Sequence, residues 1–176
     1  MPALSKDWSR GVRALELLGA RLADRGDSTW QVRGFGGLGN RIWAPADVID
    51  CGNSGIILRF FTAAAALFHG YTVLTGDESI RTIRPIGPLL EGINQLGGWA
   101  VSTKDDGHAP VVVRGPLKGG QAHIDGPDSQ FVSALLIAMA ASGRGGELHV
   151  ANAGEKPWVA LTLHWLGRLG VQVEHE

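Results

Sequence analysis

The chain has 176 residues, of which 44% are hydrophobic, and a formal net charge of −1. This size and apolar content allow a buried core, so we expect one globular domain, or two closely fused subdomains, and exclude a disordered chain. Lysine and arginine are scattered, and the longest apolar run, residues 60–68, is far shorter than a bilayer span, so the sequence favours a cytoplasmic protein with small-molecule ligands over one that binds nucleic acid or a membrane.

The first 50 residues predict one helix followed by two strands. The apolar pattern indicates a helix over residues 8–18, and Gly19 provides the left-handed residue that ends many helices. Strand-like stretches follow at residues 20–24 and 29–33.

The middle of the chain predicts a longer series of elements. Ser54 and Gly55 begin an alanine-rich helix through Leu67, and a strand follows at residues 71–75. The pair Arg84-Pro85 is expected to place proline in the first turn of the next helix, where its missing N–H costs nothing. That helix ends at Leu96-Gly97 before one strand, and a further strand is predicted at residues 110–114.

The last third of the chain repeats much of this order. A new copy begins near Gln121, Ser129 begins a helix to Ala141, and a strand follows at residues 147–151. Lys156-Pro157 begins another helix, which ends at Leu169-Gly170 before an expected strand. Equivalent features recur at a period of about 75 residues, which indicates an internal repeat.

The repeat predicts a single incomplete domain. Residues 1–50 would form a partial first copy that lacks its leading strand and helix, residues 51–120 the second copy, and residues 121–176 the third. An incomplete copy should expose an apolar face and an unpaired strand edge, which a partner chain or a homodimer would cover.

Four polar segments lie at predicted helix starts: Asn53-Ser54-Gly55, Arg84-Pro85, Asp128-Ser129-Gln130 and Lys156-Pro157. A helix start exposes unpaired N–H groups and the positive end of the helix dipole, so it suits a phosphate or a carboxylate. If the repeat turns these starts to one side, the chain has an anion-binding face. The alternative is that asparagine, serine and aspartate act here only as N-caps.

The remaining polar residues indicate no metal site. The six histidines show no pair with metal-ligand spacing, and the single cysteine, Cys51, excludes an internal disulfide and is expected to be a small buried hydrophobe. Trp158 follows Lys156-Pro157, and either ligand stacking or core packing would explain it.

Four stretches carry a resemblance to a known family: CGNSGIILR at residues 51–59, GDESIRTIRPIGPLL at residues 76–90, DSQFVSALL at residues 128–136, and EKPW at residues 155–158. In this order and spacing they resemble the EPSP synthases, and the likeness covers nearly the whole chain. The resemblance implies an α+β fold of repeated βαβαββ units, of which this chain would hold about two and a half. It also implies a transferase that moves the enolpyruvyl group of phosphoenolpyruvate to shikimate 3-phosphate without a metal or an organic cofactor.

The resemblance assigns roles to individual residues. It implies that phosphoenolpyruvate is bound by Asn53, Gly55, Arg84 and Gln130. It places the phosphorylated acceptor near Asp128, Ser129, Gln130, Glu155, Lys156 and Trp158. Ile56 and Phe60 differ from the family's usual threonine and proline, which predicts weak glyphosate binding, unless the two changes are only helix repacking.

Two departures from the family concern the acceptor. Asp128 and Glu155 stand where the family usually has serines that face the acceptor's phosphate. Each carboxylate would repel a phosphate by about 1 kcal/mol in water-like surroundings. We therefore hypothesise that a full-length relative with these residues uses a different acceptor, unphosphorylated or cationic.

Two interpretations of the function stay open. In the first, the chain is part of an enolpyruvyl transferase and is inactive alone, because the family's Lys-Ser motif and its acid and base groups are absent. In the second, it is a diverged, non-catalytic domain that binds an anion or a partner. The catalytic residues, the true acceptor and the oligomeric state are not fixed by the sequence.

Overall fold

The N-terminal part of the computed structural model is a helix followed by a hairpin; the structure describes residues 6–34 and 43–175. Helix α1 (Lys6–Leu17) leads into β1 (Arg21–Asp24), which pairs antiparallel with β2 (Trp30–Arg33). The indole of Trp8 on α1 meets the edge of Trp30 on β2, with ring centroids 5.4 Å apart. The predicted helix and both strands are therefore confirmed, with boundaries shifted by one or two residues.

The central part of the chain forms a mixed four-stranded sheet with three helices. Its elements in chain order are β3 (Ile49–Asp50), α2 (Gly55–Ala65), β4 (Gly70–Thr75), α3 (Glu78–Thr82), α4 (Gly87–Gln95), β5 (Trp99–Ser102) and β6 (Val111–Gly115). The strand order is β3-β4-β6-β5. Strands β3 and β4 are parallel, whereas β6 runs antiparallel to both β4 and β5.

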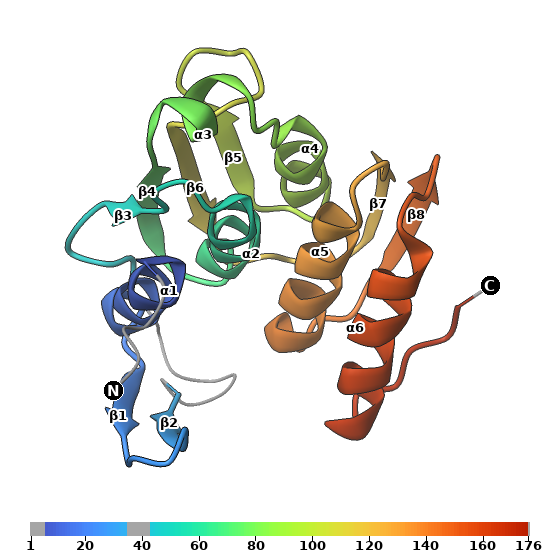
Figure 1. Ribbon diagram of the computed structural model, residues 1–176. Coiled ribbons are helices and arrows are strands. Elements are labelled where there is room, and N and C mark those ends of the chain that lie inside the picture. The colour runs from blue at the N-terminus through green and yellow to red at the C-terminus, as the bar shows by residue number, and fades with distance from the viewer. Residues whose placement is uncertain (1–5, 35–42, 176) are drawn as a thin grey trace.

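The last part repeats the beginning of that order with β7 (Gln121–Asp125), α5 (Ser129–Ser142), β8 (Glu147–Ala151) and α6 (Lys156–Arg168). Strands β7 and β8 are parallel, as β3 and β4 are. Figure 1 shows the two sheets with helices α2, α4, α5 and α6 packed between and beside them. The chain thus has the α+β fold class that the sequence predicts.

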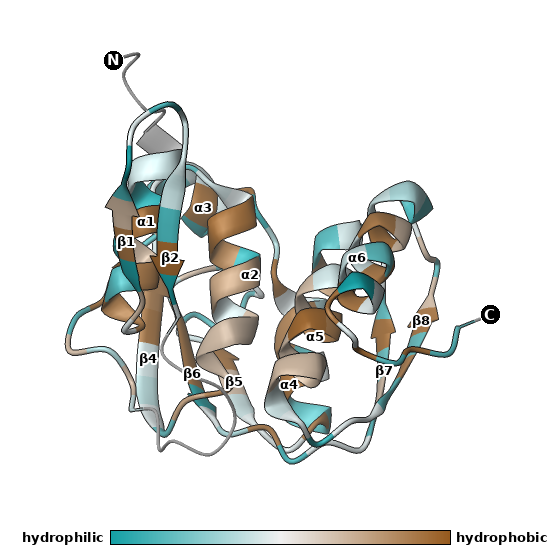
Figure 2. Cartoon of the chain, turned by 90° about the horizontal axis from the view of Figure 1, so that it is seen from below, coloured by the Kyte–Doolittle hydropathy of each residue, from teal (hydrophilic) through white to brown (hydrophobic). Residues whose placement is uncertain are grey.

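The core lies where the helices meet the sheets. Helix α5 packs against α2, α4 and α6, so apolar side chains are distributed around most of its circumference. Two of them, Phe131 and Leu135, are almost completely buried. Figure 2 shows brown, hydrophobic residues along the sides of α2 and α5 that face each other. Cys51 is buried in this core, as predicted, and burial raises the pKa of its thiol to about 12.

Two expectations about local structure are wrong. The pair Arg84-Pro85 does not begin a helix, because the short helix α3, capped by Asp77, comes first and α4 begins only at Gly87, with Pro88 in its first turn. Residues 171–175 form no strand after Gly170. The equivalent strand β5 is held by its antiparallel partner β6, and residues 171–175 have no such partner among the described residues.

None of the helices in residues 6–34 and 43–175 is long and apolar enough to cross a membrane.

Candidate functional site

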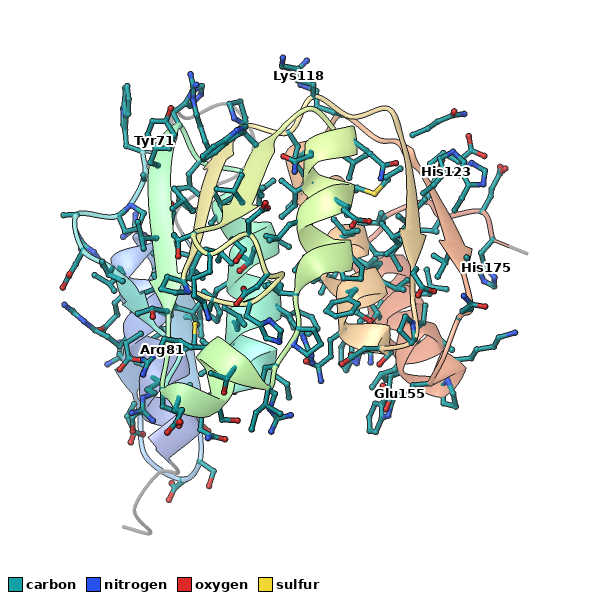
Figure 3. All side chains as sticks on the ribbon, turned by 90° about the horizontal axis from the view of Figure 1, so that it is seen from above. Tyr71, Arg81, Lys118, His123, Glu155 and His175 are labelled. Atoms are coloured by element: carbon teal, nitrogen blue, oxygen red, sulfur yellow. The ribbon has the colours of Figure 1, made fainter. Side chains whose placement is uncertain are left out.

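The parallel strands bring four loops to one edge of the molecule. In the central sheet, the loop after β3 is tied to the loop after β4, because the N–H of Asp77 donates to the carbonyl of Gly52 at 2.8 Å. In the last sheet the N–H of Gly154 donates to the carbonyl of Gly126 at 2.9 Å in the same manner. Carboxyl ends of neighbouring parallel strands meet at one edge of a sheet. Figure 3 shows Glu155 at the same edge as Arg81 and opposite Lys118.

The start of α2 is one wall of the site. Ser54 caps the helix, and its hydroxyl accepts from the N–H of Ile57 at 3.4 Å. Gly55 is buried, and a methyl group added there would lie 3.5 Å from Nη1 of Arg59 and 3.8 Å from Cδ of Arg84. Both guanidinium-bearing side chains therefore lie against the first turn of α2.

Asn53 is fixed by a partner on the next loop. Its side-chain amide donates to Oδ2 of Asp77 at 2.8 Å. This bond, followed by the bond from the N–H of Ile80, lowers the pKa of the Asp77 carboxyl. Asn53 is thus held at the edge by Asp77, the residue that caps α3. The side-chain oxygen of Asn53 takes no part in that bond.

Arg59 is the central side chain of the site, and it is only 4% exposed. Its Nη1 lies 2.7 Å from Oδ2 of Asp128 and donates to Oε1 of Gln130 at 3.1 Å, and its Nη2 donates to the carbonyl of Pro85 at 3.2 Å. The guanidinium also lies over the ring of Phe131, 4.9 Å from the centroid. One side chain of α2 therefore joins the start of α5 to the loop that carries Arg84.

Burial is the largest influence on the Arg59 guanidinium and lowers its pKa, while the nearby Asp128 raises it and Arg84 lowers it further. The Nε atom of Arg59 is buried and has no hydrogen-bond partner among the described residues. The ion pair with Asp128 compensates the cost of burying the charge.

Asp128 has two structural roles. Its Oδ1 accepts from the N–H of Gln130 at 2.9 Å and so caps α5, and its Oδ2 pairs with Arg59. Asp128 therefore caps α5, and it also pairs with Arg59, so it is more than an N-cap. Because Arg59 balances its charge, Asp128 repels an incoming anion less than the sequence alone indicates.

Ser129 is already bound to a carboxylate. Its hydroxyl donates to Oε2 of Glu155 at 2.8 Å, and its backbone N–H approaches the same oxygen at 3.4 Å. Ser129 is 2% exposed, whereas Glu155 is exposed and has a left-handed backbone. The carboxylate of Glu155 thus occupies the N-terminus of α5, where helix dipole and N–H groups favour an anion.

The first turn of α6 contributes exposed side chains. Lys156 is exposed, and Trp158 is 62% exposed, so Trp158 is not a core residue. Three of the four expected helix starts, those of α2, α5 and α6, are real and lie at this edge, whereas Arg84 reaches it from a loop. Ile56 is 59% exposed on the first turn of α2, so a change there is not simple core repacking, whereas Phe60 packs against the core.

The arrangement suits an anionic ligand. Gly55, Arg84 and Gln130 surround Arg59 at the starts of α2 and α5, with Ser129 and Glu155 next to them. The exposed guanidinium of Arg84 has no ion-pair partner within the described part of the chain, and Arg binds carboxylate or phosphate with paired donors. No cluster of three or more metal-ligating side chains occurs among residues 6–34 and 43–175.

Sequence reasoning did not identify Arg59 and Asp77 as site residues. Arg59 is the single charged residue in the mostly apolar helix α2, four residues after Gly55, and that isolated charge is the signal that could have indicated a buried polar role. Asp77 follows a predicted strand and precedes Glu78-Ser79, a pattern typical of a helix cap.

Comparisons with known proteins agree with one family. The family model described as EPSP synthase (3-phosphoshikimate 1-carboxyvinyltransferase) matches residues 2–176. A 3-phosphoshikimate 1-carboxyvinyltransferase of Acetivibrio thermocellus is 44% identical over 174 residues, which are 99% of this chain and 40% of that protein. One from Halobacterium salinarum is 48% identical over 172 residues, which cover 97% of this chain and 39% of that protein.

A solved structure of an EPSP synthase also resembles this chain. The EPSP synthase of Acinetobacter baumannii superimposes with a TM-score of 0.66 and 25% identity, over 76% of this chain and 30% of that protein. The chain therefore spans about 40% of the length of the curated relatives that it matches.

Proposed function

The chain belongs to the EPSP synthase family, and from this premise we propose that it forms part of an enolpyruvyl transferase whose phosphoenolpyruvate and acceptor sites lie at the edge built by α2, α5 and α6. The acceptor would be shikimate 3-phosphate or a related molecule. In the reaction, an acceptor hydroxyl adds to the enol carbon of phosphoenolpyruvate, which gains a proton at its methylene carbon. Phosphate then leaves the enol carbon, and the former methylene carbon loses a proton, so the enolpyruvyl group is transferred.

The bonds of Arg59 carry the proposal. They connect the start of α5, through Asp128 and Gln130, with the loop that presents Arg84. Arg84 and Gln130 would bind the carboxylate or phosphate of phosphoenolpyruvate, and Asn53 and Gly55 would line its pocket. Arg59 is a positioning residue here, since its Nη1 and Nη2 atoms are bonded to protein atoms.

The residues around α6 would form the acceptor side. Ser129, Glu155, Lys156 and Trp158 lie at or beside the starts of α5 and α6. Lys156 offers a positive charge and Trp158 an exposed ring face for an acceptor ring. Both proton transfers need an acid or a base within hydrogen-bond reach, and the family resemblance assigns neither role to these residues, so we expect no turnover by this chain alone.

A second candidate concerns the acceptor and is favoured by the bond between Ser129 and Glu155. The carboxylate of Glu155 takes the hydroxyl and the N–H that an acceptor phosphate would use. An unphosphorylated or cationic acceptor would then fit better than a phosphate dianion. Outside catalysis, a diverged, non-catalytic domain that binds an anion or a partner chain stays the alternative.

Calorimetric titration at low ionic strength tests the proposal. We expect the chain to bind phosphoenolpyruvate weakly, and Arg84→Ala to abolish the binding. Arg144→Ala, which removes an exposed arginine beyond the other end of α5, should leave it unchanged. Equal loss in both variants would mean that net charge and not the site explains the binding, and no binding by the unaltered chain would favour a diverged domain that binds a partner chain.

A further inference from the structure

The last sheet places two histidines side by side. His123 of β7 and His149 of β8 are opposite each other in the parallel register, and their imidazole rings stack with centroids 4.3 Å apart and planes 6° apart. Ala122 and Ile124 are buried on either side of His123 in β7, so the alternation of the strand turns His123 to the outer face of the sheet. Both histidines are exposed, and Figure 3 shows His123 at the margin of the molecule, away from Glu155.

The backbone under the pair is held in place. The side-chain amide of Gln95, at the end of α4, donates to the carbonyl of His123 at 2.9 Å and accepts from its N–H at 2.7 Å. Strand β7 is thus bonded to α4 on one edge and to β8 on the other. The two rings are therefore carried by rigid elements, which is what a precise binding site needs.

Glu147 determines which nitrogen of His149 carries the proton. Nε2 of His149 lies 3.1 Å from Oε1 of Glu147, and the other carboxylate oxygen accepts from the side-chain amide of Gln121 at 2.7 Å. A carboxylate only accepts, so the proton of His149 is on Nε2. Two protonated rings at 4.3 Å would repel each other, so the stack favours a neutral imidazole, in which Nδ1 carries the lone pair.

This arrangement is typical of a histidine that binds a metal ion. Such a histidine usually donates its other ring N–H to a carboxylate, which fixes the tautomer and orients the ring, and His149 has this partner. Bonds between zinc and imidazole nitrogen are about 2.0–2.1 Å long, so two nitrogens that share an ion are at most about 4 Å apart. Rings that stack at 4.3 Å need only small rotations of two exposed side chains to reach this distance.

The ligands determine the kind of ion. Neutral imidazole binds Zn²⁺, Ni²⁺ and Cu²⁺, whereas Mg²⁺ and Ca²⁺ prefer oxygen ligands. The protein supplies two ligands here, because the oxygens of Glu147 are already bonded to His149 and Gln121. Water would fill the remaining positions, so the affinity should be lower than that of a structural site with four protein ligands.

We propose that His123 and His149 together bind one divalent transition-metal ion on the outer face of the last sheet, with Nδ1 of His149 as one ligand and Glu147 as a positioning residue. The spacing of histidines along the chain does not predict this pair, because the two become neighbours only when β7 and β8 form their sheet. The proposal rests on the contacts of these two strands and does not depend on the proposed function.

Titration of the full chain with zinc chloride tests the proposal. Calorimetry should show one Zn²⁺ bound per chain with a dissociation constant below about 1 mM, and NMR of the imidazole nitrogens should show His123 and His149 changing together. Magnesium chloride at the same concentrations should leave both histidines unchanged. Cys51 is buried and should not compete. Unchanged His123 and His149 signals up to about 1 mM Zn²⁺ would leave only a stacked pair and overturn the proposal.

Histidine variants separate a shared ion from binding to single side chains. His123→Gln and His149→Gln should each weaken zinc binding by about tenfold or more, since either change removes the advantage of two linked ligands. His164→Gln removes an exposed histidine of α6 and should leave the affinity unchanged. Equal losses in all three variants, or no loss in the first two, would contradict the proposal.

The role of Glu147 has its own measurement. In the metal-free chain the nitrogen spectrum should place the proton of His149 on Nε2, and zinc should then bind at Nδ1. Glu147→Ala should remove this tautomer preference and weaken zinc binding by about tenfold, and Glu147→Gln, which keeps an acceptor oxygen, should restore much of the affinity. Zinc bound at Nε2 of His149 would show that Glu147 does not position the ring.

A zinc ion shared between two chains is the competing outcome. If the ion is bound within one chain, the sedimentation coefficient should be the same with and without zinc. One Zn²⁺ per two chains, together with a dimer that forms only when zinc is present, would assign the histidines to an interface between copies and overturn the proposal.

Discussion

The hydroxyl of Ser129 is hydrogen-bonded to the carboxylate of Glu155 at 2.8 Å, across the start of α5. A serine that the family resemblance assigns to the acceptor is therefore already occupied by an anion of the same chain. Before a phosphate could bind here, Glu155 would have to move, and breaking its bonds to Ser129 costs binding energy.

Replacing Glu155 tests this competition. In Glu155→Ser the hydroxyl and N–H of Ser129 are free, so shikimate 3-phosphate should bind about tenfold more tightly than to the unaltered chain. Glu147→Ser makes the same charge change at the other end of β8 and should leave the affinity unchanged. Calorimetry measures both, and no gain in Glu155→Ser would show that Glu155 does not oppose the phosphate.

The Arg59–Asp128 pair should be a large local contribution to stability. Arg59→Ala leaves Asp128 without its cation and opens space beside Phe131, so we expect the free energy of unfolding to fall by about 2–3 kcal/mol. Urea denaturation measures the loss. Arg144→Ala should cost less than about 0.5 kcal/mol.

A double-mutant cycle separates the ion pair from the helix cap. Asp128→Asn keeps a side-chain oxygen for the N–H of Gln130 but removes the charge. Combined with Arg59→Met, the double variant should lose less stability than the sum of the single ones, because neither partner is left as an unpaired buried charge. Strict additivity would contradict a direct interaction between the two residues.

The hydrogen bond from Asn53 should keep the Asp77 carboxyl ionised at pH values below its ordinary pKa of 3.8. A lowered pKa in the folded state means that the stabilisation is present above pH 3.8 and is lost as the pH falls through the folded value. NMR titration of Asn53→Ala should show the Asp77 inflection at higher pH than in the unaltered chain. An unchanged inflection would mean that the backbone bonds alone set it.

The contribution of Cys51 to stability should depend on pH in the opposite direction to that of Asp77. Burial raises the pKa of its thiol from 9.0 to about 12, so the unfolded chain loses this proton at lower pH than the folded chain. Stability should therefore fall as the pH rises from 9.0 toward 12. Cys51→Ala should show a smaller fall over this range in urea denaturation, and identical slopes for the two proteins would contradict the assignment.

Local signals made most of the elements predictable. Ser54 and Asp128 were expected before the helices that they cap, and the strand at residues 147–151 was predicted with the bounds that β8 has. The helix start predicted at Arg84-Pro85 was wrong, because Pro88 also suits a first turn and α4 begins at Gly87.

Contacts between distant residues were not predictable in the same way. Arg59 meets Asp128 only because α2 packs against α5, and no local pattern encodes that approach. The Ser129–Glu155 bond likewise depends on the left-handed backbone of Glu155 before α6. Residues 171–175 show the reverse case, in which strand propensity is present and the partner strand is not.

The position of Arg59 on α2, with its partners on α5, also has a consequence for folding. The central and last parts of the chain could each form their own strands and helices, yet neither would hold the guanidinium, Gln130 and the Arg84 loop in place. Affinity for an anion at this edge would therefore arise only when the two helices dock. In a refolding experiment, ligand binding would report the late, long-range step and not the formation of secondary structure.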